Sequence, residues 1–534
     1  MKRLFVKASI GAAGLLALLV PLQGCTNLDE KPPSLITPNN FYSSESEVLA
    51  ALAGIYAQLR TTTPEGTIYD ANEISTDEDV VPTRGSDWFD GGQWIDLHNM
   101  TWTPTSTATL NFFNGAWNNP YAGIAQANLF LAATKSTTFP NKASIVGEVR
   151  ALRAFYYYIL MDFFGGVPIV TDTGLAAAKH ARNTRREVFN FIEQELIAAR
   201  DSGLPATRDA GDNGRFTQGG ADAILANMYL NAGVFTKDGA AGGISATTYN
   251  SCAGILVTRG LDACQAADSA ADRLLNSGIY RLADSFPQNF RSDNYLSPEN
   301  IFVVKFIAQD GLGMDYAMAI LHYNQYAPLT PWNGFAITAA SFNAFDSTDK
   351  RRQVVLIGRQ HDVLSGELVN DRAGNPLIFT DTIHNIHSAT EGEGGRIYKW
   401  PADPSHVSQN SGNDFAWFRL GEIYLIKAEV QNVLGNPAAA LTLLNQLRAR
   451  RDTVAPPLLG PVTPALILKE RLFELLGEGK RRQDLIRFGA YTSRVDDPSL
   501  IGGKSAAVAD HYVLAPIPQT QIDANPLLTQ NAGY

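Results

Sequence analysis

The chain has 534 residues, of which 45% are hydrophobic and 18% are charged, the ordinary balance of a globular protein. Its 53 acidic residues outnumber its 43 basic ones, so the formal net charge is −10. This balance argues against nucleic acid as a partner, because a phosphate backbone requires a basic surface. At this length the chain can form two or three domain-sized cores or one large composite core.

The first 24 residues have the pattern of a secretory leader. A basic start at residues 2–7 precedes an uncharged apolar run, residues 8–20, that is too short to span a bilayer. The run ends in Leu22-Gln23-Gly24-Cys25, which resembles a lipobox with Cys25 as the lipidated residue. The alternative is plain secretion with a free thiol at Cys25. An exposed thiol is a liability in an oxidising compartment, which favours lipidation and hence a membrane-tethered protein.

The chain that would remain after cleavage is more acidic than the whole. Loss of the leader's three basic residues leaves 40 basic against 53 acidic residues, a net charge of −13. Anionic lipid is therefore disfavoured as an electrostatic partner, and neutral ligands are favoured. The densest later apolar run, residues 151–170, is broken by Arg153 and Asp162. We expect a chain that is anchored to a membrane by lipid and not inserted in it.

Helical periodicity covers much of the N-terminal part. Apolar residues recur three and four apart over residues 43–59. Trp117, Tyr121, Ile124 and Leu131 continue one stripe at the same spacing. Further helices are predicted over residues 148–164, 187–204 and 218–232.

Three more helices are predicted near the C-terminus, over residues 415–434, 438–450 and 463–488. Gly435-Asn436-Pro437 separates the first two, and Gly suits a helix end while Pro suits the first turn of the next helix. The first helix opens with Trp417-x2-Leu420-Gly421-x2-Tyr424, half of the tetratricopeptide pattern. The turn at Gly435 comes later than a 34-residue repeat would place it. We therefore expect an all-α scaffold of stacked tetratricopeptide-like hairpins, with a concave face for a partner.

Residues 236–410 have a different character. Short β-type runs at residues 301–306 and 354–357 lie among loops rich in Gly, Asp and Asn, and the aromatic content argues against disorder. We expect an irregular, partly β, mostly loop region packed on the helices, which is where ligand sites tend to lie. The predicted regions are a leader (1–24), an N-terminal helical region (25–235), the loop-rich region (236–410) and a C-terminal helical region (411–534).

Cys252 and Cys264 form an even pair in an exported chain, which predicts a local disulfide. Two separately buried thiols are the alternative. A metal site is disfavoured here, because no His or further Cys lies at ligand spacing nearby.

The usual enzymatic signatures fail. Gly502-Gly503-Lys504-Ser505 resembles the end of a phosphate loop, but Pro498 occupies the place of the leading Gly. No Gly-x-Ser-x-Gly elbow occurs. His384 and His387 have the spacing of two metal ligands but lie in a Gly-rich, loop-like stretch. We predict no catalysis, no metal and no cofactor. A surface glycoside hydrolase stays open as a rival, because it needs only two carboxylates at the right separation.

Three carboxylates near the C-terminus have a regular spacing. Glu470, Glu474 and Glu478 lie four residues apart, so one continuous helix would carry them on one face, close to Arg481 and Arg482. A ladder of this kind suggests acid–base catalysis or an ion-pair network. We favour the network, joining helices.

Two aromatic clusters in polar loops are the best binding candidates. Sugar rings have an apolar face and a fringe of hydroxyls, so their binders combine flat aromatics with amides and carboxylates. Residues 87–94 and 322–334 have this composition, whereas Trp117 and Trp417 lie on helical stripes and are expected in the core. Closure of loops over the core is the alternative role for the loop aromatics. The predicted ligand contacts are Asp87, Trp88, Trp94, Tyr323, Trp332 and Asn333.

Six segments in order resemble the SusD/RagB family of nutrient-binding lipoproteins. The last of them is ERLFELLGEGKRRQDLIRFG at 470–489, followed by the closing APIPQTQIDANPLLTQNAGY. The others are Phe41-Tyr42 with Gly54-Ile55-Tyr56, the Trp117…Tyr121…Asn128 helix, Glu148-Val-Arg150-Ala-Leu-Arg153-Ala, Phe164-Gly165-Gly166-Val167-Pro168, and Arg419-Leu-x-Glu422-x-Tyr424-Leu with Ala428-Glu429.

The resemblance implies a surface-exposed, lipid-anchored outer-membrane protein. It would bind a nutrient, with oligosaccharide or polysaccharide as the first expectation, and deliver it to a SusC-like TonB-dependent transporter. A peptide, captured as RagB-like members do, is the alternative ligand. The resemblance leaves open which glycan or peptide binds and whether calcium does.

Overall fold

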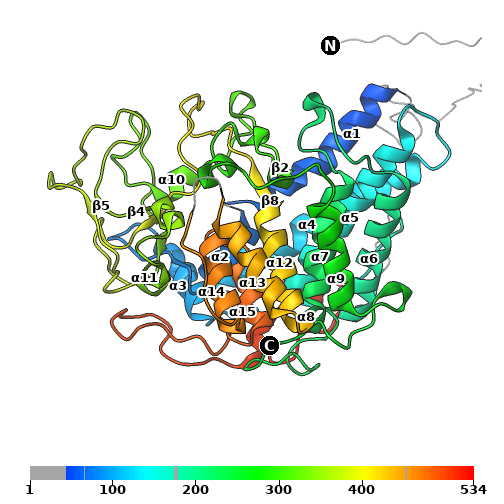
Figure 1. The fold of residues 1–534 in the computed structure, drawn as a ribbon. Coiled ribbons are helices and arrows are strands. Elements are labelled where there is room, and N and C mark those ends of the chain that lie inside the picture. The colour runs from blue at the N-terminus through cyan, green and yellow to red at the C-terminus, as the bar shows by residue number, and fades with distance from the viewer. Residues whose placement is uncertain (1–43, 65, 174–178, 451–453) are drawn as a thin grey trace, which may run out of the picture.

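The computed structural model describes residues 44–64, 66–173, 179–450 and 454–534 (Figure 1). The predicted leader, Cys25 and Phe41-Tyr42 lie outside the described residues. Ten helices, nine of them of eleven residues or more, form the scaffold: α1 Glu45–Ala57, α4 Asn114–Ala133, α5 Lys142–Phe164, α6 Arg185–Ser202, α7 Gln218–Leu230, α9 Ala263–Leu275, α12 Leu420–Val433, α13 Pro437–Arg448, α14 Pro464–Leu475 and α15 Arg481–Arg487. Shorter helices are α2 Thr67–Ile74, α3 Gln93–Asn99, α8 Ala232–Phe235, α10 Tyr316–Ile320, α11 Ala339–Ala344 and α16 Gln519–Ala524.

The strands are short and pair only in twos. The antiparallel pairs are β1 Asp79–Val80 with β3 Ala336–Ile337, β2 Asn300–Val304 with β8 Phe415–Arg419, β4 Val355–Leu356 with β7 Arg396–Ile397, and β5 Gly358–Arg359 with β6 Ile378–Phe379. The chain is therefore an all-α protein with a partly β, loop-rich region, as predicted.

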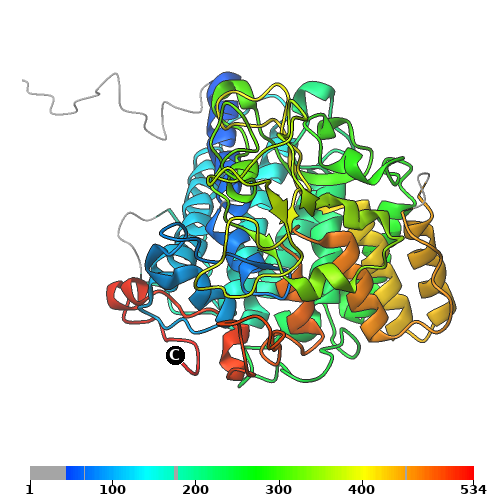
Figure 2. The ribbon, with the colours of Figure 1, turned by 90° about the vertical axis from the view of Figure 1, so that its left-hand side faces the viewer.

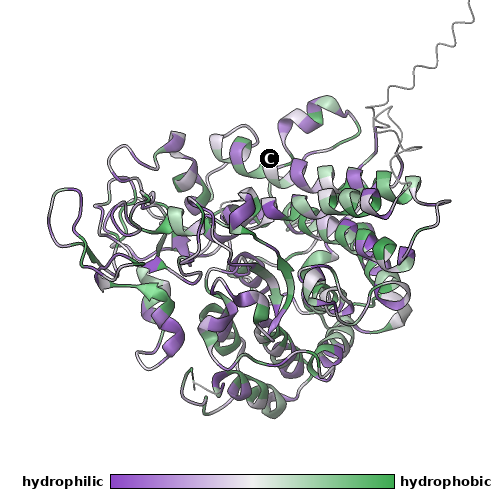
Figure 3. Ribbon diagram, turned by 90° about the horizontal axis from the view of Figure 1, so that it is seen from above, coloured by the Kyte–Doolittle hydropathy of each residue, from purple (hydrophilic) through white to green (hydrophobic). Residues whose placement is uncertain are grey.

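The scaffold is a row of helices in which each packs against the next. The order of contact is α4, α5, α6, α7, α9, α12 and α13. Figure 3 shows the helices curving around one side while the loop-rich part occupies the other, and Figure 2 shows these loops in front of the row. This is the stacked-hairpin arrangement expected from the sequence. Among the described residues, none of the helices is both long and apolar enough to cross a bilayer.

Local signals explain where several helices begin. Ser44 and Glu47 form a capping box at α1, and Thr184 and Glu187 form another at α6, so free backbone N–H groups are satisfied. The turn between α12 and α13 has Gly435 in the left-handed region (φ 84°) and Pro437 in the first helical turn, as predicted.

The N-terminal motif residues hold one another. The hydroxyl of Tyr121 donates to the carbonyl of Pro168 (2.9 Å), and the amide of Asn128 donates to the carbonyl of Val170 (2.8 Å). Arg153 in turn donates to the Asn128 amide oxygen (2.7 Å) and pairs with Glu195 (2.6 Å). The α4 and α5 motifs therefore act together, fixing the chain as it leaves α5.

Two predicted helices were wrong in part. The stretch predicted as one helix over 415–434 begins as strand β8, because Phe415–Arg419 is buried on both faces and pairs with β2. Trp417 is core as predicted, but in a strand, and its indole N–H donates to Thr62 Oγ1 (2.8 Å). Half of the tetratricopeptide pattern thus spans a strand–helix junction.

The second error is the predicted helix over 463–488, which is broken into α14 and α15. Gly477 and Gly479 both have φ of 71°, a backbone conformation that other residues adopt only at a cost. Their N–H groups donate to Glu78 (3.0 Å) and Glu73. Glu478 therefore lies in a turn and not on the helical face predicted for it.

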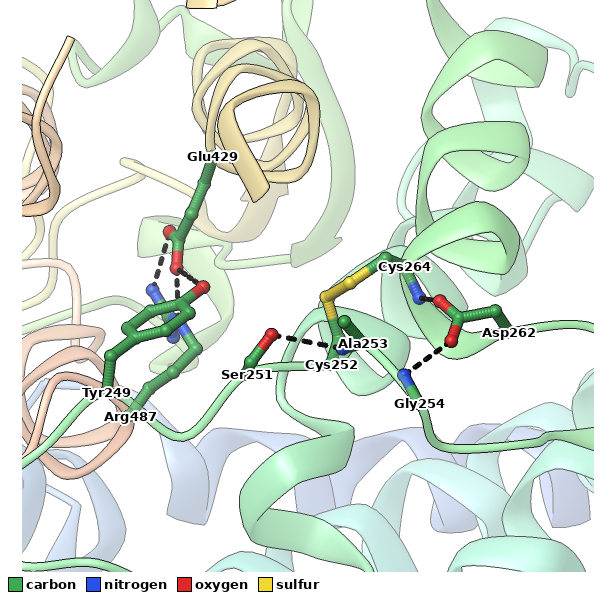
Figure 4. The surroundings of a disulfide bond; sticks show 9 residues. All are labelled: Tyr249, Ser251, Cys252, Ala253, Gly254, Asp262, Cys264, Glu429 and Arg487. Carbon is green, nitrogen blue, oxygen red and sulfur yellow. Dashed lines mark hydrogen bonds and ion pairs between the residues drawn. A yellow bond between two sulfur atoms is a disulfide. The ribbon is translucent and has the colours of Figure 1, made fainter. Parts of the chain in front are cut away.

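The loop-rich region also contributes to the scaffold. Helix α9 lies within 236–410 and packs between α7 and α12, so it belongs to the row of helices. Its start is tied down by a disulfide between Cys252 and Cys264, with 5.1 Å between the Cα atoms (Figure 4).

The carboxylates of 470–478 form a buried ion-pair network, which was the favoured interpretation. Arg419 contacts Glu299 (2.8 Å), Glu474 (2.6 Å) and Glu478 (2.7 Å), and all four are buried. Arg450 contacts Glu299 and Glu474 as well. Burial alone would raise the pKa of Glu474, but the surrounding arginines hold it well below its usual range. The network links the C-terminal turn to the end of β8 and to Glu299, the residue before β2.

A second part of the network lies beside the disulfide (Figure 4). Arg487 pairs with Glu429 (2.6 Å) and with Asp484 (2.8 Å). The hydroxyl of Tyr249 also donates to Glu429 (2.8 Å), and Asn250 N–H donates to the Arg487 carbonyl (2.7 Å). The chain leading to Cys252 is therefore docked on the C-terminal motif.

A group of carboxyls on and after α2 is buried with fewer cationic partners than the carboxylates of the network. Asp70, Glu73, Glu78 and Asp79 are all buried. Burial raises the pKa of Glu73 to about 7. Burial, together with the neighbouring Glu73, raises the pKa of Asp79 to about 8.

Loss of Arg419 should be costly. In Arg419→Met, Glu474 and Glu478 would stay buried with one cation fewer, and we expect the free energy of unfolding to fall by about 3–5 kcal/mol. Arg281→Met is the matched control, because Arg281 and Asp284 form an exposed pair worth less than about 1 kcal/mol. Guanidinium unfolding monitored by circular dichroism measures both variants. Equal, small changes would contradict a supporting role for the network.

Stability should fall as the pH rises from 6.5 to 8. The folded state keeps protons on Glu73 and Asp79 that the unfolded state has released above a pH of about 4.5. The stabilisation from these protons is complete below the unfolded pKa values and is lost as the pH passes 7 and 8, about 2 kcal/mol for the pair. Thermal melting across this pH range measures the loss.

The control is the double variant Glu73→Gln, Asp79→Asn, in which each amide keeps one acceptor oxygen but cannot ionise. Its melting temperature should change less between pH 6.5 and 8 than that of the wild type. The difference between the two proteins isolates these groups from His322 and Lys504, whose lowered pKa values act with the opposite sign. Parallel pH profiles would refute the assignment.

Candidate ligand-binding site

A loop before α3 presents the first predicted cluster. Trp88 (φ 62°), Asp90 (φ 40°), Gly91 (φ 68°) and Gly92 (φ 82°) all adopt left-handed backbone conformations, which makes a tight turn that ends where α3 begins. Left-handed conformations are costly for non-Gly residues and are kept where the surroundings enforce them. At Trp88 those surroundings are tertiary contacts.

Trp88 is half-buried and joins the two predicted clusters. Its indole N–H donates to the carbonyl of Trp332 (2.6 Å), 244 positions further along the chain. A side chain at Gly334 would collide with the Trp88 ring, since an added Cβ would lie 2.4 Å from it. Gly334 therefore allows the ring to lie directly on the backbone of the second cluster.

Trp94 belongs to the core and not to the ligand surface. It is 7% exposed, its ring packs against Trp88 at 5.4 Å and Phe112 at 5.0 Å, and its indole N–H donates to Asp90 (2.8 Å). The prediction of Trp94 as a ligand contact is corrected accordingly. It supports Trp88 from below, because α3 turns it inward.

Asn333 is likewise a supporting residue. It is fully buried with φ of 54°, its amide oxygen accepts from Arg396 (2.8 Å), and its amide nitrogen donates to the carbonyl of Glu391 (3.1 Å). A ligand cannot reach it in this conformation. Its predicted role as a ligand contact is therefore corrected: Asn333 joins its own loop to the segment that carries Glu391 and Arg396.

Tyr323 and Asp87 meet at the surface, together with residues that the sequence did not nominate. The Tyr323 hydroxyl donates to Asp87 (2.6 Å), and the guanidinium of Arg372 lies 4.0 Å from the centre of the Tyr323 ring. Arg372 also pairs with Glu391 and reaches Asp87 at 3.5 Å. Burial and the hydrogen bond to Asp87 raise the pKa of Tyr323 to about 12, so the hydroxyl stays protonated at neutral pH.

A buried histidine fixes Glu391. His322 Nδ1 faces the N–H of Asn324 (3.2 Å) and must accept from it, so the proton lies on Nε2, which donates to Glu391 (2.9 Å). Burial lowers the pKa of His322 and favours this neutral form. Burial would raise the pKa of Glu391, but hydrogen bonds from His322 and Arg372 hold it at about 2.

A groove lies against this cluster. It has a volume of about 510 Å³, and its lining includes Arg84, Asp371, Arg372, Thr390 and Glu391. Two members of this cluster, Arg372 and Glu391, line the groove. We use the term platform for these two and for the surface residues joined to them by contact or along the chain: Asp87, Trp88, Phe89, Tyr323 and Trp332.

Phe89 is the most exposed aromatic residue of the platform, at 59%. Trp88, Tyr323 and Trp332 are half-buried. The structure thus brings together Asp87, Trp88, Tyr323 and Trp332 of the predicted set. Phe89 had a signal in the sequence, since it follows Trp88 in a polar loop. No sequence pattern marked Arg372 and Glu391 as ligand contacts, because only the folded chain places them beside Asp87 and Tyr323.

Solved structures identify the class of fold. Surface glycan-binding protein A from Bacteroides uniformis has a TM-score of 0.70 at 22% identity, over 92% of this chain and all of that one. The protein of the same name from Bacteroides thetaiotaomicron, in complex with laminarihexaose, has a TM-score of 0.68 at 20% identity, over 92% of this chain and all of that one. The chain therefore has the SusD-like fold.

Sequence comparison gives the family. Residues 294–534 match the model described as SusD family, and residues 27–230 match one described as starch-binding associating with outer membrane. The starch-binding protein SusD of Bacteroides thetaiotaomicron is 26% identical over 518 residues, 88% of this chain and 85% of its own length. The chain belongs to the SusD/RagB family, which the C-terminal motif had indicated.

Asn333→Ala should destabilise the protein although the residue lies beside the platform. Arg396 would lose a buried partner and Ala would occupy a left-handed position, together about 3 kcal/mol. Asn324→Ala is the matched control, because Asn324 is exposed and its side chain makes a single hydrogen bond, to the Asn370 carbonyl. We expect a change below about 1 kcal/mol for it. Chemical unfolding measures both variants. Equal losses of stability would argue against a structural role for Asn333.

Proposed function

We propose that the protein is a surface-exposed outer-membrane lipoprotein that captures a glycan on the platform and delivers it to a SusC-like TonB-dependent transporter. The observation that carries the proposal is the platform itself: an exposed Phe89 and three half-buried aromatics together with fixed polar groups, two of which line a groove. The family membership and the glycan-binding names of its relatives support it.

The chemistry of the platform fits a neutral, hydroxyl-rich ligand. Flat aromatic rings complement the apolar faces of sugars, and side chains at fixed positions supply directed hydrogen bonds. The positive charge of Arg372 is offset by Glu391 and Asp87. A strongly charged ligand would have to break these pairs, whereas a neutral glycan can bind to them as they stand.

The same contacts argue against catalysis. Hydrolysis of a glycoside requires a carboxylic acid that keeps its proton near neutral pH. The pKa of Glu391 is about 2, so this group is ionised and cannot donate a proton. Asp87 is engaged with the Tyr323 hydroxyl. We therefore propose a binding protein and not an enzyme.

Delivery and anchoring are part of the proposal. Lipidation at Cys25 would tether the chain to the outer membrane with its folded part outside, and the row of helices would offer a broad rigid surface to the transporter. A glycan on the platform would then be released into the transporter beneath.

Ligand binding by residues 26–534 should depend on the aromatic rings of the platform. We expect saturable binding of laminarihexaose or maltohexaose, weakened about tenfold or more in Phe89→Ala and in Trp332→Ala, because each removes a stacking surface. Leu129→Ala is the matched control, an exposed apolar residue (44%) on the scaffold helix α4, and should bind as the wild type does. Isothermal titration calorimetry measures the affinities.

Three results would count against the proposal. Binding of extended peptides in place of both hexasaccharides would favour peptide capture. Release of reducing sugar would favour the hydrolase. Unchanged affinity in both ring variants would move the site away from the platform.

A further inference from the structure

Exposed aromatic rings are rare on this protein. Of all Phe, Tyr and Trp residues in the described ranges, only Phe89 (59%) and Tyr295 (50%) are more than a third exposed. Phe89 belongs to the platform. Tyr295 lies elsewhere, in the short turn just before strand β2, and the proposed function gives it no role.

Tyr295 lines a cleft of about 440 Å³. One wall is the connection between α6 and α7, the floor includes β2, and the rim carries the exposed apolar side chains of Ile279 (39%) and Leu296 (64%). None of its lining residues is shared with the groove at the platform. The two hollows are therefore separate features of the surface.

Tyr295 is held through both its ring and its backbone. The ammonium of Lys305 lies 4.7 Å from the ring centre and is itself paired with the buried Asp414 (3.2 Å). The amide of Asn213, from the opposite wall, donates to the Tyr295 carbonyl (3.0 Å). An exposed ring with a fixed orientation binds with little loss of rotamer entropy.

The wall opposite Tyr295 is equally rigid. Arg208 (2.7 Å) and Arg215 (2.6 Å) both pair with Glu148, which is fully buried, and Arg215 also pairs with Asp212 (2.9 Å). Their positive charge is thus offset where it lies. The cleft offers hydrogen-bonding groups without an excess of either charge, which disfavours phosphates and other anions.

One polar atom in the cleft lacks a partner. The side-chain oxygen of Asn300, a lining residue, is buried and has no hydrogen-bond partner among the described residues. Buried polar atoms are rarely left unpaired, so a donor that reached this oxygen through a small shift of the lining side chains would complete its hydrogen bonding. A hydroxyl of a sugar is a donor of the required kind.

The cleft also continues beyond Tyr295. A neighbouring hollow of about 410 Å³ shares Ala206, Ile279 and Tyr280 with it and ends at Arg200 and Arg273, which both pair with Asp222. The two hollows adjoin through these shared residues, and the arginines in their lining are all paired. Two adjoining hollows offer room for more than one sugar unit.

We infer that these adjoining hollows form a second glycan-binding site, with the Tyr295 ring as its stacking surface and Asn300 as a hydrogen-bond acceptor. The inference rests on the proposed function for its ligand class, a neutral oligosaccharide. It adds to that function a second point of contact for one glycan or a site for a second.

Calorimetric titration of residues 26–534 with laminarihexaose and maltohexaose tests the second site. The wild type should bind two equivalents of one hexasaccharide, or show two affinities. Tyr295→Ala should remove one of them, with a loss of tenfold or more in affinity at that site, and Tyr295→Phe should keep it. Phe89→Ala should remove the other. Far-UV circular dichroism checks that each variant is folded.

The outcomes separate the two claims. One equivalent in the wild type, with Tyr295→Ala unchanged and Phe89→Ala weakened, overturns the second site and leaves the platform. Loss of binding in Tyr295→Ala alone supports the second site and overturns the platform. No binding of either hexasaccharide by the folded wild type overturns both. Equal weakening by Tyr295→Phe and Tyr295→Ala would overturn the stacking role.

Discussion

The buried ion pairs of the C-terminal motif are the constraint on which the rest of the structure depends. Arg419 ends strand β8 at the start of α12, while its partners Glu299, Glu474 and Glu478 come from the residue before β2, from α14 and from the turn after α14. Desolvating so many charges is unfavourable unless each has partners of good geometry. The arrangement therefore tolerates few alternatives, and it forces the strand pair, the glycine turn and α2 into one relation. The carboxylate spacing at 470–478, which suggests catalysis when the sequence is read alone, therefore serves to hold these elements together.

The same logic extends outward to the platform, through single buried polar residues. Asn333 holds the loop of Glu391, Arg396 holds Asn333, and His322 holds Glu391 from the other side. Asn333, Arg396 and His322 are buried, and they join chain segments that lie far apart in the sequence. The exposed rings thus rest on a layer that cannot rearrange cheaply. A surface ordered before the ligand arrives has a smaller entropic cost of binding.

Much of the scaffold could be predicted from the sequence, because helix signals are local. Capping residues such as Ser44 and Thr184, the Gly435–Pro437 turn and the apolar stripes set the helices correctly to within a few residues. The failures have tertiary causes. Phe415–Arg419 is a strand because β2 pairs with it, and α14 ends where Gly477 and Gly479 meet carboxylates of the α2 region. Loop composition pointed to residues 87–94 and 322–334 but could not separate rings at the surface from those beneath. Trp88 and Trp94 are six positions apart, but Trp88 lies in the turn before α3 whereas Trp94 lies in the first turn of α3, which directs it inward.

That distinction bears on how a protein of this fold would bind a polymer. Aromatic residues make up 10% of the chain, and nearly all of those described are committed to packing the helices and loops. An exposed aromatic ring contributes roughly 1.5–3 kcal/mol less to the free energy of unfolding than a fully buried one. Two such rings remain exposed: Tyr295 lines the cleft before β2, and Phe89 belongs to the platform. The charged groups of each of these two surfaces are already paired. A glycan that met both would gain from linkage, since the second contact forms at high effective concentration. Modest contacts on a rigid surface would then suffice to hold a long chain, while short products of its breakdown would leave easily.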